Sequence, residues 1–481
     1  MASPRLRWGA SGALALILVL ATWLRLRHLG LAGFGDDQGI ALRIAHEILH
    51  GDIRTVGLAS SSGAANPPLY VYIVAAVIGI HDSVPFANAS VAVLSVVAIA
   101  LTYVIVRPRF GRTVALVTTA LFATAPWAVF AERYLWQQNY LPLVAVSLLW
   151  AFFCVLERER TRVVLFVPVL FAIAIQLSLS AVALLLPIIA LIAYRARAIY
   201  WRAFAAGTAV GVLLLSTWLA HNAKHGFRDF RLIVTHGRGH HGGATGTGTL
   251  EAVRQTFNIV STEGWSFLTG AQHQVGAAWT LGRAAGVVVI VLLVLGMVTS
   301  LVRVVRGGRH PGIDTARRGL LVVWLVGIWL GYISSSKSGA GPSYLIVTYP
   351  VSFLLAALGL HDAAALLGRR SAAVSLAAAA AIAAAYVAFT LSFQSFVQHH
   401  GGTAGTYGVI YDDTAALAAA VRARGLHVDD PPAEYLVSGH LGAPEGTTRF
   451  VTTRFRLRDT SPLPCSGERQ RFGPIEACFP Q

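Results

Sequence analysis

The chain has 481 residues, of which 55% are hydrophobic and only 12% are charged, whereas a soluble protein carries roughly 25% charge. A mean hydropathy of +0.62 and many apolar runs near 20 residues argue against a water-soluble protein and predict a polytopic α-helical membrane protein. The formal charge of +16 is no sign of nucleic-acid binding, because arginine clusters between spans are what the positive-inside rule produces.

The N-terminus imitates a signal peptide, with Arg5 and Arg7 before an apolar run over 8–24. No small-x-small cleavage site follows this run, and Arg25 and Arg27 close it. We therefore expect a retained first span with a cytoplasmic N-terminus in the plasma membrane.

Apolar segments predict eleven spans. In chain order they are 8–24, 84–106, 113–131, 140–156, 163–178, 180–194, 203–220, 277–302, 319–333, 344–360 and 372–393. Residues 163–178 and 180–194 nearly touch, which predicts a helical hairpin with a tight turn around Ser178 and Ser180. Residues 67–80 are apolar as well, but they are short and open with Pro-Pro, so we expect a helix that lies at the membrane interface.

The distribution of arginine supports this topology. With eleven spans, the inner loops are 1–7, 107–112, 157–162, 195–202, 303–318 and 361–370. They hold 18 Arg among 53 residues, whereas the outer segments are much more dilute in Lys and Arg. Counting 67–80 as a further span would move three of these clusters to the side opposite Arg5 and Arg7, against the positive-inside rule.

This topology divides the chain into a transmembrane region, 1–393, and a small extracytoplasmic tail, 394–481. The outer side also receives the first loop (25–83), the long loop (221–276) and two short turns. The tail has one helical stretch and two strand-like pieces, which predicts a small α/β appendage. Cys465 and Cys478 can pair there if the tail is outside the cytoplasm, whereas Cys154 lies in a span as a small core residue.

Two adjacent carboxylates, Asp36 and Asp37, stand near the start of the longest polar interruption in the first third of the chain. Such residues can simply be solvated, or they can cap the following helix by accepting backbone N–H bonds. Alternatively, a carboxylate at the membrane surface can act as a general base on an attacking hydroxyl. Its neighbour can orient it, raise its pKa or bind a divalent cation, although the pair does not demand a metal.

Cationic and hydrogen-bonding side chains are expected on the same outer side. They are Arg133, His236, Arg238, His240, His241, Lys337 and Tyr344. Each alone is a weak signal, because a loop His is usually solvated and a terminal Lys usually extends to the head groups. Together they can form a cationic ring around a phosphate, which needs such charge when it is a leaving group. The His spacing matches no strong zinc pattern.

These motifs resemble those of GT-C fold glycosyltransferases, in the family-39-like group of protein O-mannosyltransferases and lipid A aminoarabinose transferases. The cues in the first loop are the Asp pair, Gly51-Asp52 and the Pro-Pro-Leu-Tyr entry to the interfacial helix. Two further cues are Arg133 at the outer end of the third span and a turn in which Lys337 precedes a Pro-x-Tyr motif, Pro342 to Tyr344. The similarity covers roughly residues 5–360.

The resemblance implies a polyprenyl-phosphate sugar as donor, an acceptor outside the cytoplasm, and in-line attack that inverts the anomeric centre. It puts the catalytic base at Asp36, with Asp37 standing where the family usually has Glu. The residues near positions that hold the lipid phosphate in relatives are His236, Arg238, Lys337 and Tyr344, with Arg133 as a weaker candidate.

The sequence departs from the family at two places. Asn66 precedes Pro67-Pro68 where the aminoarabinose transferases place a phosphate-binding Lys, so the donor can differ. Gln137, Gln138 and Asn139 stand where relatives often have a second acidic residue. A site with two separated carboxylates is therefore not expected from the local pattern.

Two other classes of protein were weighed against a transferase. A transporter or flippase of lipid-linked sugars needs polar residues inside the spans or broken helices with a midplane site, whereas the polar residues here are concentrated in outer loops. A non-catalytic membrane scaffold would tolerate loss of the Asp36 carboxylate. The sequence does not identify the sugar or the acceptor (protein, glycan or lipid).

Overall fold

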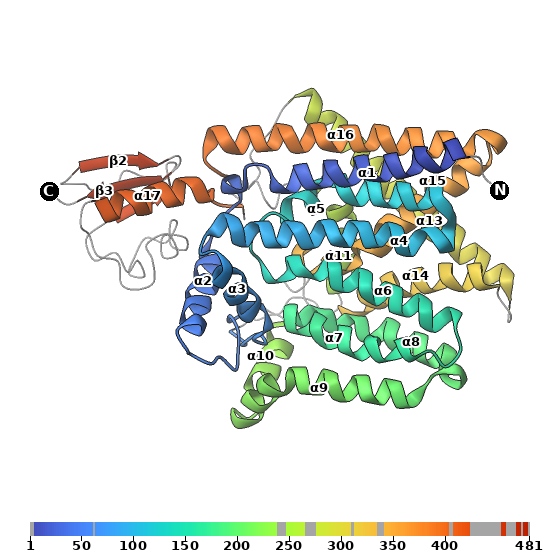
Figure 1. The fold of residues 1–481 in the computed structure, drawn as a ribbon, viewed down its shortest axis with the longest axis horizontal. Helices are drawn as coiled ribbons and strands as arrows, with labels where there is room; N and C mark the ends of the chain where they lie inside the picture. The colour runs from blue at the N-terminus through green and yellow to red at the C-terminus, as the bar shows by residue number, and fades with distance from the viewer. Residues whose placement is uncertain are drawn as a thin grey trace.

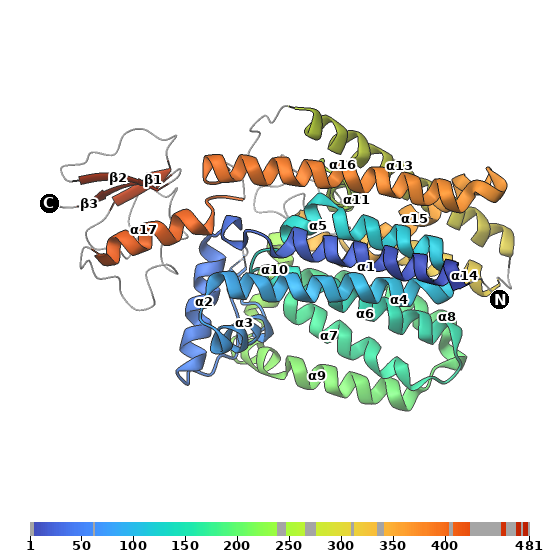
Figure 2. The ribbon, with the colours of Figure 1, turned by 45° about the horizontal axis from the view of Figure 1, so that its top comes forward.

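The computed structural model describes residues 4–60, 63–237, 247–264, 276–308, 312–333, 341–403, 407–423, 454–457, 468–472 and 475–479. Most of this chain is helical, and the long helices run side by side in one bundle (Figures 1 and 2). The N-terminus lies at one end of the bundle, and the C-terminal region lies beyond the opposite end.

Helices cover all eleven predicted spans. The bundle helices are α1 (Pro4–Leu26), α4 (Val84–Thr124), α5 (Pro126–Ala131), α6 (Leu141–Glu157), α7 (Phe166–Leu177), α8 (Leu185–Arg195), α9 (Trp201–Lys224), α13 (Ala277–Gly307), α14 (Ile313–Gly331), α15 (Tyr349–Ala365) and α16 (Ser371–His400). A break at Gly111, with φ of 84°, divides α4 into two segments that correspond to two predicted spans. The predicted hairpin turn is also present, with Ser178 Oγ and Ser180 Oγ 2.7 Å apart.

Seven helical stretches of the described chain are long and apolar enough to cross a bilayer. Shorter apolar helices add to them, among them 162–177. Large apolar side chains such as Leu213 on α9 and Val291 on α13 point outward, at 71% and 58% exposure. Such a surface is stable only against lipid, so the chain is an integral membrane protein. The exact number of crossings, eleven, stays a prediction.

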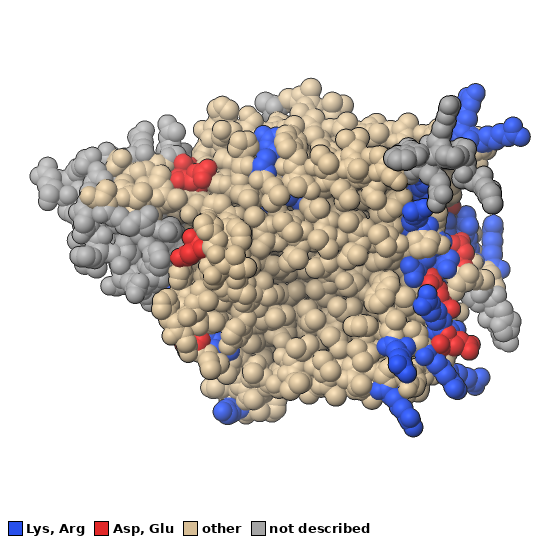
Figure 3. All heavy atoms as spheres, in the orientation of Figure 1, with Lys and Arg blue, Asp and Glu red and all other residues tan. Residues whose placement is uncertain are grey.

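Charge separates the two ends of the bundle. Figure 3 shows Lys and Arg gathered at the end where the chain begins, with Asp and Glu among them. Several of these arginines join helices: Arg109 and Arg317 both bond Glu157, and Arg318 bonds Asp362 at 2.7 Å. The arginine-rich end is the one that the positive-inside rule assigns to the cytoplasm.

Two helices of the first loop lie across the opposite end of the bundle. They are α2 (Asp36–Leu49) and α3 (Leu69–Ile80), which pack against each other (Figure 1). α3 also packs against α4 and α7, and its place at the membrane interface stays a prediction. The long loop supplies α10 (Arg228–Gly237) and α11 (Thr247–Val260). Short 3-10 helices connect these elements; they are η1 (Leu29–Leu31), η2 (Gln137–Tyr140), η3 (Arg162–Leu165), η4 (Leu179–Leu184), η5 (Ala196–Ala198), η7 (Pro342–Thr348) and η8 (Gly368–Arg370).

Two glycines let α13 and α15 approach each other closely. A Cβ atom at Gly296 would lie 1.9 Å from the Leu355 carbonyl oxygen, and one at Gly359 would lie 2.1 Å from that of Leu292. Only glycine therefore fits at both positions, and the two backbones touch. Close approach through small residues is a common way for helices to associate in a membrane.

The C-terminal region contains one helix and three strands in its described part. α17 (Tyr411–Ala423) is followed by β1 (Arg454–Leu457), β2 (Glu468–Phe472) and β3 (Ile475–Phe479). α17 and β1 fall on predicted pieces, whereas β2 and β3 were not predicted. The three strands form an antiparallel sheet in the order β1-β3-β2. The strand-like piece at 433–439 and Cys465 lie outside the described residues, so the pairing of Cys465 with Cys478 stays a prediction.

α17 begins with two acidic residues, Asp412 and Asp413. Burial raises the pKa of Asp413 to about 6, and the charge of Asp412 adds to the shift. Burial also raises the pKa of Asp412, whereas nearby His28 lowers it. The first turn of α17 therefore favours a protonated Asp413.

We expect this turn to lose stability as the pH rises from about 4 to above 6. The folded state keeps the Asp413 proton up to about pH 6, whereas the unfolded carboxyl loses it near 3.9, so the folded state binds more protons in this window. Asp413→Asn should stabilise the protein at pH 8 by on the order of 1 kcal/mol after discounting for partial exposure. The gain should be about half as large at pH 5.

Thermal unfolding at both pH values measures this effect. Glu159→Gln, an exposed carboxylate at the other end of the bundle, is the matched control and should change Tm at neither pH. An equal gain for Asp413→Asn at pH 5 and pH 8 would contradict the assignment.

Candidate active site

The predicted carboxylate pair opens α2 at the end of the bundle opposite the N-terminus. Asp36 is the first residue of α2, and its side chain lies outside the described part of the structure. Gln38 fixes this turn, because its Oε1 accepts from Gly35 N at 2.8 Å and its Nε2 donates to Leu135 O at 3.0 Å. The start of α2 is therefore attached to the turn that follows α5.

Asp37 faces an aromatic environment. Burial raises the pKa of Tyr70 well above its usual value, with Tyr140 and then Asp37 adding to the shift. Burial raises the pKa of Tyr134 too, and the Asp37 charge again contributes. Asp37 is only partly buried, whereas Tyr70 and Tyr140 are almost fully covered. A carboxylate thus stands close to protonated tyrosine hydroxyls at the end of the bundle opposite the N-terminus.

A buried ion pair lies beneath this loop. Arg25, at the end of α1, and Glu132, after α5, are both fully buried, and Arg25 Nη2 lies 2.8 Å from Glu132 Oε2. Arg25 Nε also donates to Ser95 Oγ at 2.8 Å, and Nη1 donates to Ala123 O at 2.8 Å. Ser95 Oγ in turn donates to Glu132. The pair therefore joins α1 to both halves of α4 and to the turn after α5.

Arg133 extends this attachment along the first loop. Its Nη2 donates to the carbonyl oxygens of Arg27 and His28, the latter at 2.9 Å. Arg133 is 5% exposed, and burial lowers its pKa to about 10. The prediction had Arg133 as a weaker phosphate ligand. This Nη2 therefore helps to position the loop, and a role of Arg133 as a weaker phosphate ligand stays a prediction.

Asn66 is likewise occupied within the protein. Its Nδ2 donates to Leu58 O at 3.0 Å, and its own N–H donates to the same oxygen at 2.9 Å. The side chain is 5% exposed. The prediction had Asn66 at a donor-binding position. Its Nδ2 helps to close the loop between α2 and α3, and its place in donor binding stays a prediction.

The remaining predicted ligands are described only in part. Tyr344 is partly buried in η7, and η7 packs against η2, which carries Gln138 and Asn139. The side chain of His236 at the end of α10, and the whole of Arg238 and Lys337, lie outside the described residues. Among the described side chains, no three metal-ligating residues lie together.

Comparison with known proteins bears on this arrangement. Residues 65–221 match the family model for dolichyl-phosphate-mannose-protein mannosyltransferase, which is about a third of the chain. The crystal structure of ArnT from Cupriavidus metallidurans bound to undecaprenyl phosphate has a TM-score of 0.56 at 14% identity, covering 89% of this chain and 84% of that chain. The apo structure of ArnT gives 0.57 at 15% identity with the same coverage. The chain has the GT-C fold of membrane glycosyltransferases.

The GT-C resemblance predicted from the first-loop motifs is thus confirmed for the fold. No curated protein matches the chain. At 14–15% identity the ArnT likeness extends to architecture and does not transfer a substrate or a set of catalytic residues.

Sequence reasoning missed the Arg25–Glu132 pair in this GT-C bundle. Arg25 was interpreted only as the end of the first span, and Glu132 was not singled out. One signal was available, since Glu132 directly follows a long apolar segment and charge at such a depth needs a partner.

We expect Glu132→Ala to destabilise the protein by about 3–5 kcal/mol, because it leaves the Arg25 guanidinium buried without a counter-charge. Glu132→Gln keeps the shape and one acceptor and should cost less. Size-exclusion recovery and Tm of purified protein measure the effect. Glu159→Ala is the control for an exposed glutamate, and equal behaviour of Glu132→Ala and this control would refute the structural role of the pair.

Proposed function

We propose that the protein transfers a sugar from a polyprenyl-phosphate carrier to an acceptor outside the cytoplasm. The observation that carries the proposal is that Asp36 and Asp37 open α2 at the end of a GT-C bundle opposite the N-terminus. Two findings support it: the matched family model describes a transferase that uses a lipid-phosphate sugar, and the solved ArnT contains undecaprenyl phosphate. Both concern other proteins, and they suggest the donor class for this one.

The proposed orientation follows from charge. The arginine-rich end, where the N-terminus lies, faces the cytoplasm of the plasma membrane, and α2, α3 and the tail lie on the outer side. The acceptor then meets the donor where the first loop covers the bundle. α3, with its apolar side chains, forms part of the wall along which the lipid tail enters.

Asp36 is proposed as the general base. Its carboxylate takes the proton of the acceptor hydroxyl while that oxygen forms a bond to the anomeric carbon. The bond from this carbon to the phosphate oxygen breaks on the opposite face, so the configuration inverts and polyprenyl phosphate leaves. Asp37 supports Asp36: its negative charge disfavours a second negative charge nearby, which raises the affinity of Asp36 for the proton.

His236, Arg238, Lys337 and Tyr344 are proposed to hold the phosphate. The leaving phosphate gains negative charge as its bond to the sugar breaks, and cationic donors near it stabilise that charge. Arg133 remains a weaker candidate for this set, because its Nη2 is already bonded to the loop backbone. A divalent cation on the Asp36–Asp37 pair is a separate proposal, and loss of activity in a chelator, restored by Mg²⁺ or Mn²⁺, tests it.

Asp36→Asn provides the central test. In a purified assay with a panel of polyprenyl-phosphate sugars, we expect kcat to fall by about 10²–10⁴ because the mutant amide cannot accept the proton. Asp37→Asn should lower kcat less. Asp82→Asn is the matched control, since it removes an exposed carboxylate at the same end of the bundle.

The configuration of the product distinguishes the remaining outcomes. Inversion at the anomeric carbon, read by NMR coupling constants, supports direct attack. Full transfer by Asp36→Asn would refute the base assignment. Movement of intact lipid-linked sugar across vesicles, with no glycosidic bond broken, would instead make the protein a flippase.

A further inference from the structure

We propose that the segment after α16 acts as a strap that positions the catalytic loop. The strap comprises residues 401–403 and 407–411, and it lies on residues 31–34, directly before Asp36. Its residues are positioning residues, because none of them has to touch the substrate. The inference rests on the proposed function only through the role of Asp36, whereas the effect on the loop can be measured by itself.

Backbone pairing attaches the strap to the loop. Gly33 and Ile410 form an antiparallel bridge, with Phe34 N donating to Val409 O and Tyr411 N donating to Ala32 O, both at 2.9 Å. These bonds fix the backbone immediately before the first turn of α2. Phe34 is 3% exposed, and its ring meets that of Tyr411 edge to face at 5.4 Å.

A second bridge attaches the strap to the bundle. Gly402 pairs with Val409, and Ile410 N donates to Gly401 O at 3.0 Å. Gly401 directly follows α16, whose side chains pack on α4 and α13. The strap thus links the end of α16 to the loop. The strap and residues 31–34 are more than 350 residues apart in sequence.

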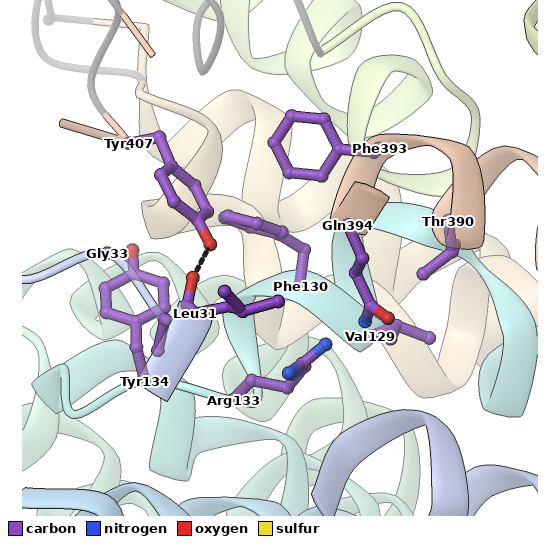
Figure 4. Close-up of a pocket in the computed structure, with 11 residues that line it drawn as sticks. Leu31, Gly33, Val129, Phe130, Arg133, Tyr134, Thr390, Phe393, Gln394 and Tyr407 are labelled. Carbon is purple, nitrogen blue, oxygen red and sulfur yellow. Dashed lines mark hydrogen bonds between the residues drawn. The ribbon is translucent and has the colours of Figure 1, made fainter. Parts of the chain in front are cut away.

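The side chain of Tyr407 adds a further contact between the strap and the loop. Its hydroxyl donates to the Leu31 carbonyl, as the dashed line in Figure 4 marks, and its ring lies 4.6 Å from that of Phe130. Tyr407 is 9% exposed. The cavity left between the strap, the loop and α16 is only about 10 Å³, about enough for one water molecule. The strap is therefore packed against the loop.

The loop is held from two directions. Arg133 bonds the carbonyls of Arg27 and His28 from the bundle, and the strap bonds residues 31–34. Asp36 follows the second attachment by two residues. Because a catalytic base must stay within hydrogen-bond reach of its proton, a shift of about 1 Å here should matter for the chemical step.

Gly33→Ala offers a small change that separates strap and loop. A Cβ at Gly33 would lie 2.4 Å from the Tyr407 carbonyl oxygen, and this backbone atom cannot move away cheaply. Tyr407→Phe removes only the hydroxyl bond to Leu31. Gly12→Ala is the matched control, because nothing lies within 4 Å of the added methyl group.

Two readouts are taken on the full-length protein in nanodiscs. Hydrogen exchange of peptides covering residues 28–40 should speed up about tenfold in Gly33→Ala and less in Tyr407→Phe, with Gly12→Ala like wild type. With a polyprenyl-phosphate sugar, kcat should fall about tenfold in Gly33→Ala while the donor KM stays within about twofold, since the strap contains none of the proposed phosphate ligands.

Faster exchange together with lower kcat and a steady KM supports the strap. Unchanged exchange in both variants overturns it, as does faster exchange with wild-type kcat, which would make the strap merely structural. An active Asp36→Asn enzyme refutes the base assignment instead, and the exchange result still decides whether the strap holds the loop.

Discussion

The buried ion pair of Arg25 and Glu132 is the interaction on which the end of the bundle that carries the first loop depends. Two charges without access to water are costly, and their retention requires short contacts and further hydrogen bonds. Here Ser95 and the backbone oxygens of α4 supply those bonds. The position of α1 relative to α4 and to the turn after α5 is therefore defined by directional contacts as well as by apolar packing.

From this pair, the first loop is attached in steps along the chain. Arg133 binds the loop two or three residues after Arg25, and Gln38 binds Leu135 at the start of α2. The turn over 132–135 and the loop thus run side by side and share polar contacts. The irregular backbone of the loop is therefore held in place by several bonds. General-base catalysis needs such a fixed position, because the base must stay aligned with the proton it takes.

Much of the architecture could be predicted from the sequence because lipid imposes a simple rule. A span must be apolar and helical, so hydropathy located the helices, and arginine counts separated the two ends. The short run at 67–80 forms a helix, and its predicted place at the interface rests on its Pro-Pro start and on the charge pattern. α17 was visible as a helical stretch, whereas only part of the predicted strand content lies within the described residues.

The site was harder to predict because its contacts join distant residues. Arg133 and Asn66 looked like ligands in sequence, since polar residues in outer loops are usually available. The structure shows both engaged with backbone oxygens, which no local pattern reveals. Glu132 was overlooked for the same reason, because its partner is 107 residues away. Long-range pairing of this kind follows from packing, which a single sequence does not display.

The contact between Tyr407 and Leu31 joins residues 376 positions apart, and this separation has a consequence for biogenesis. The chain is made from its N-terminus, so α1 and the first loop enter the membrane long before the segment after α16 is synthesised. The loop that carries the carboxylate pair therefore receives its last attachment only when the final bundle helix is in place. Assembly and completion of the site are thus linked in time, and a nascent chain that stops short of residue 407 lacks this attachment.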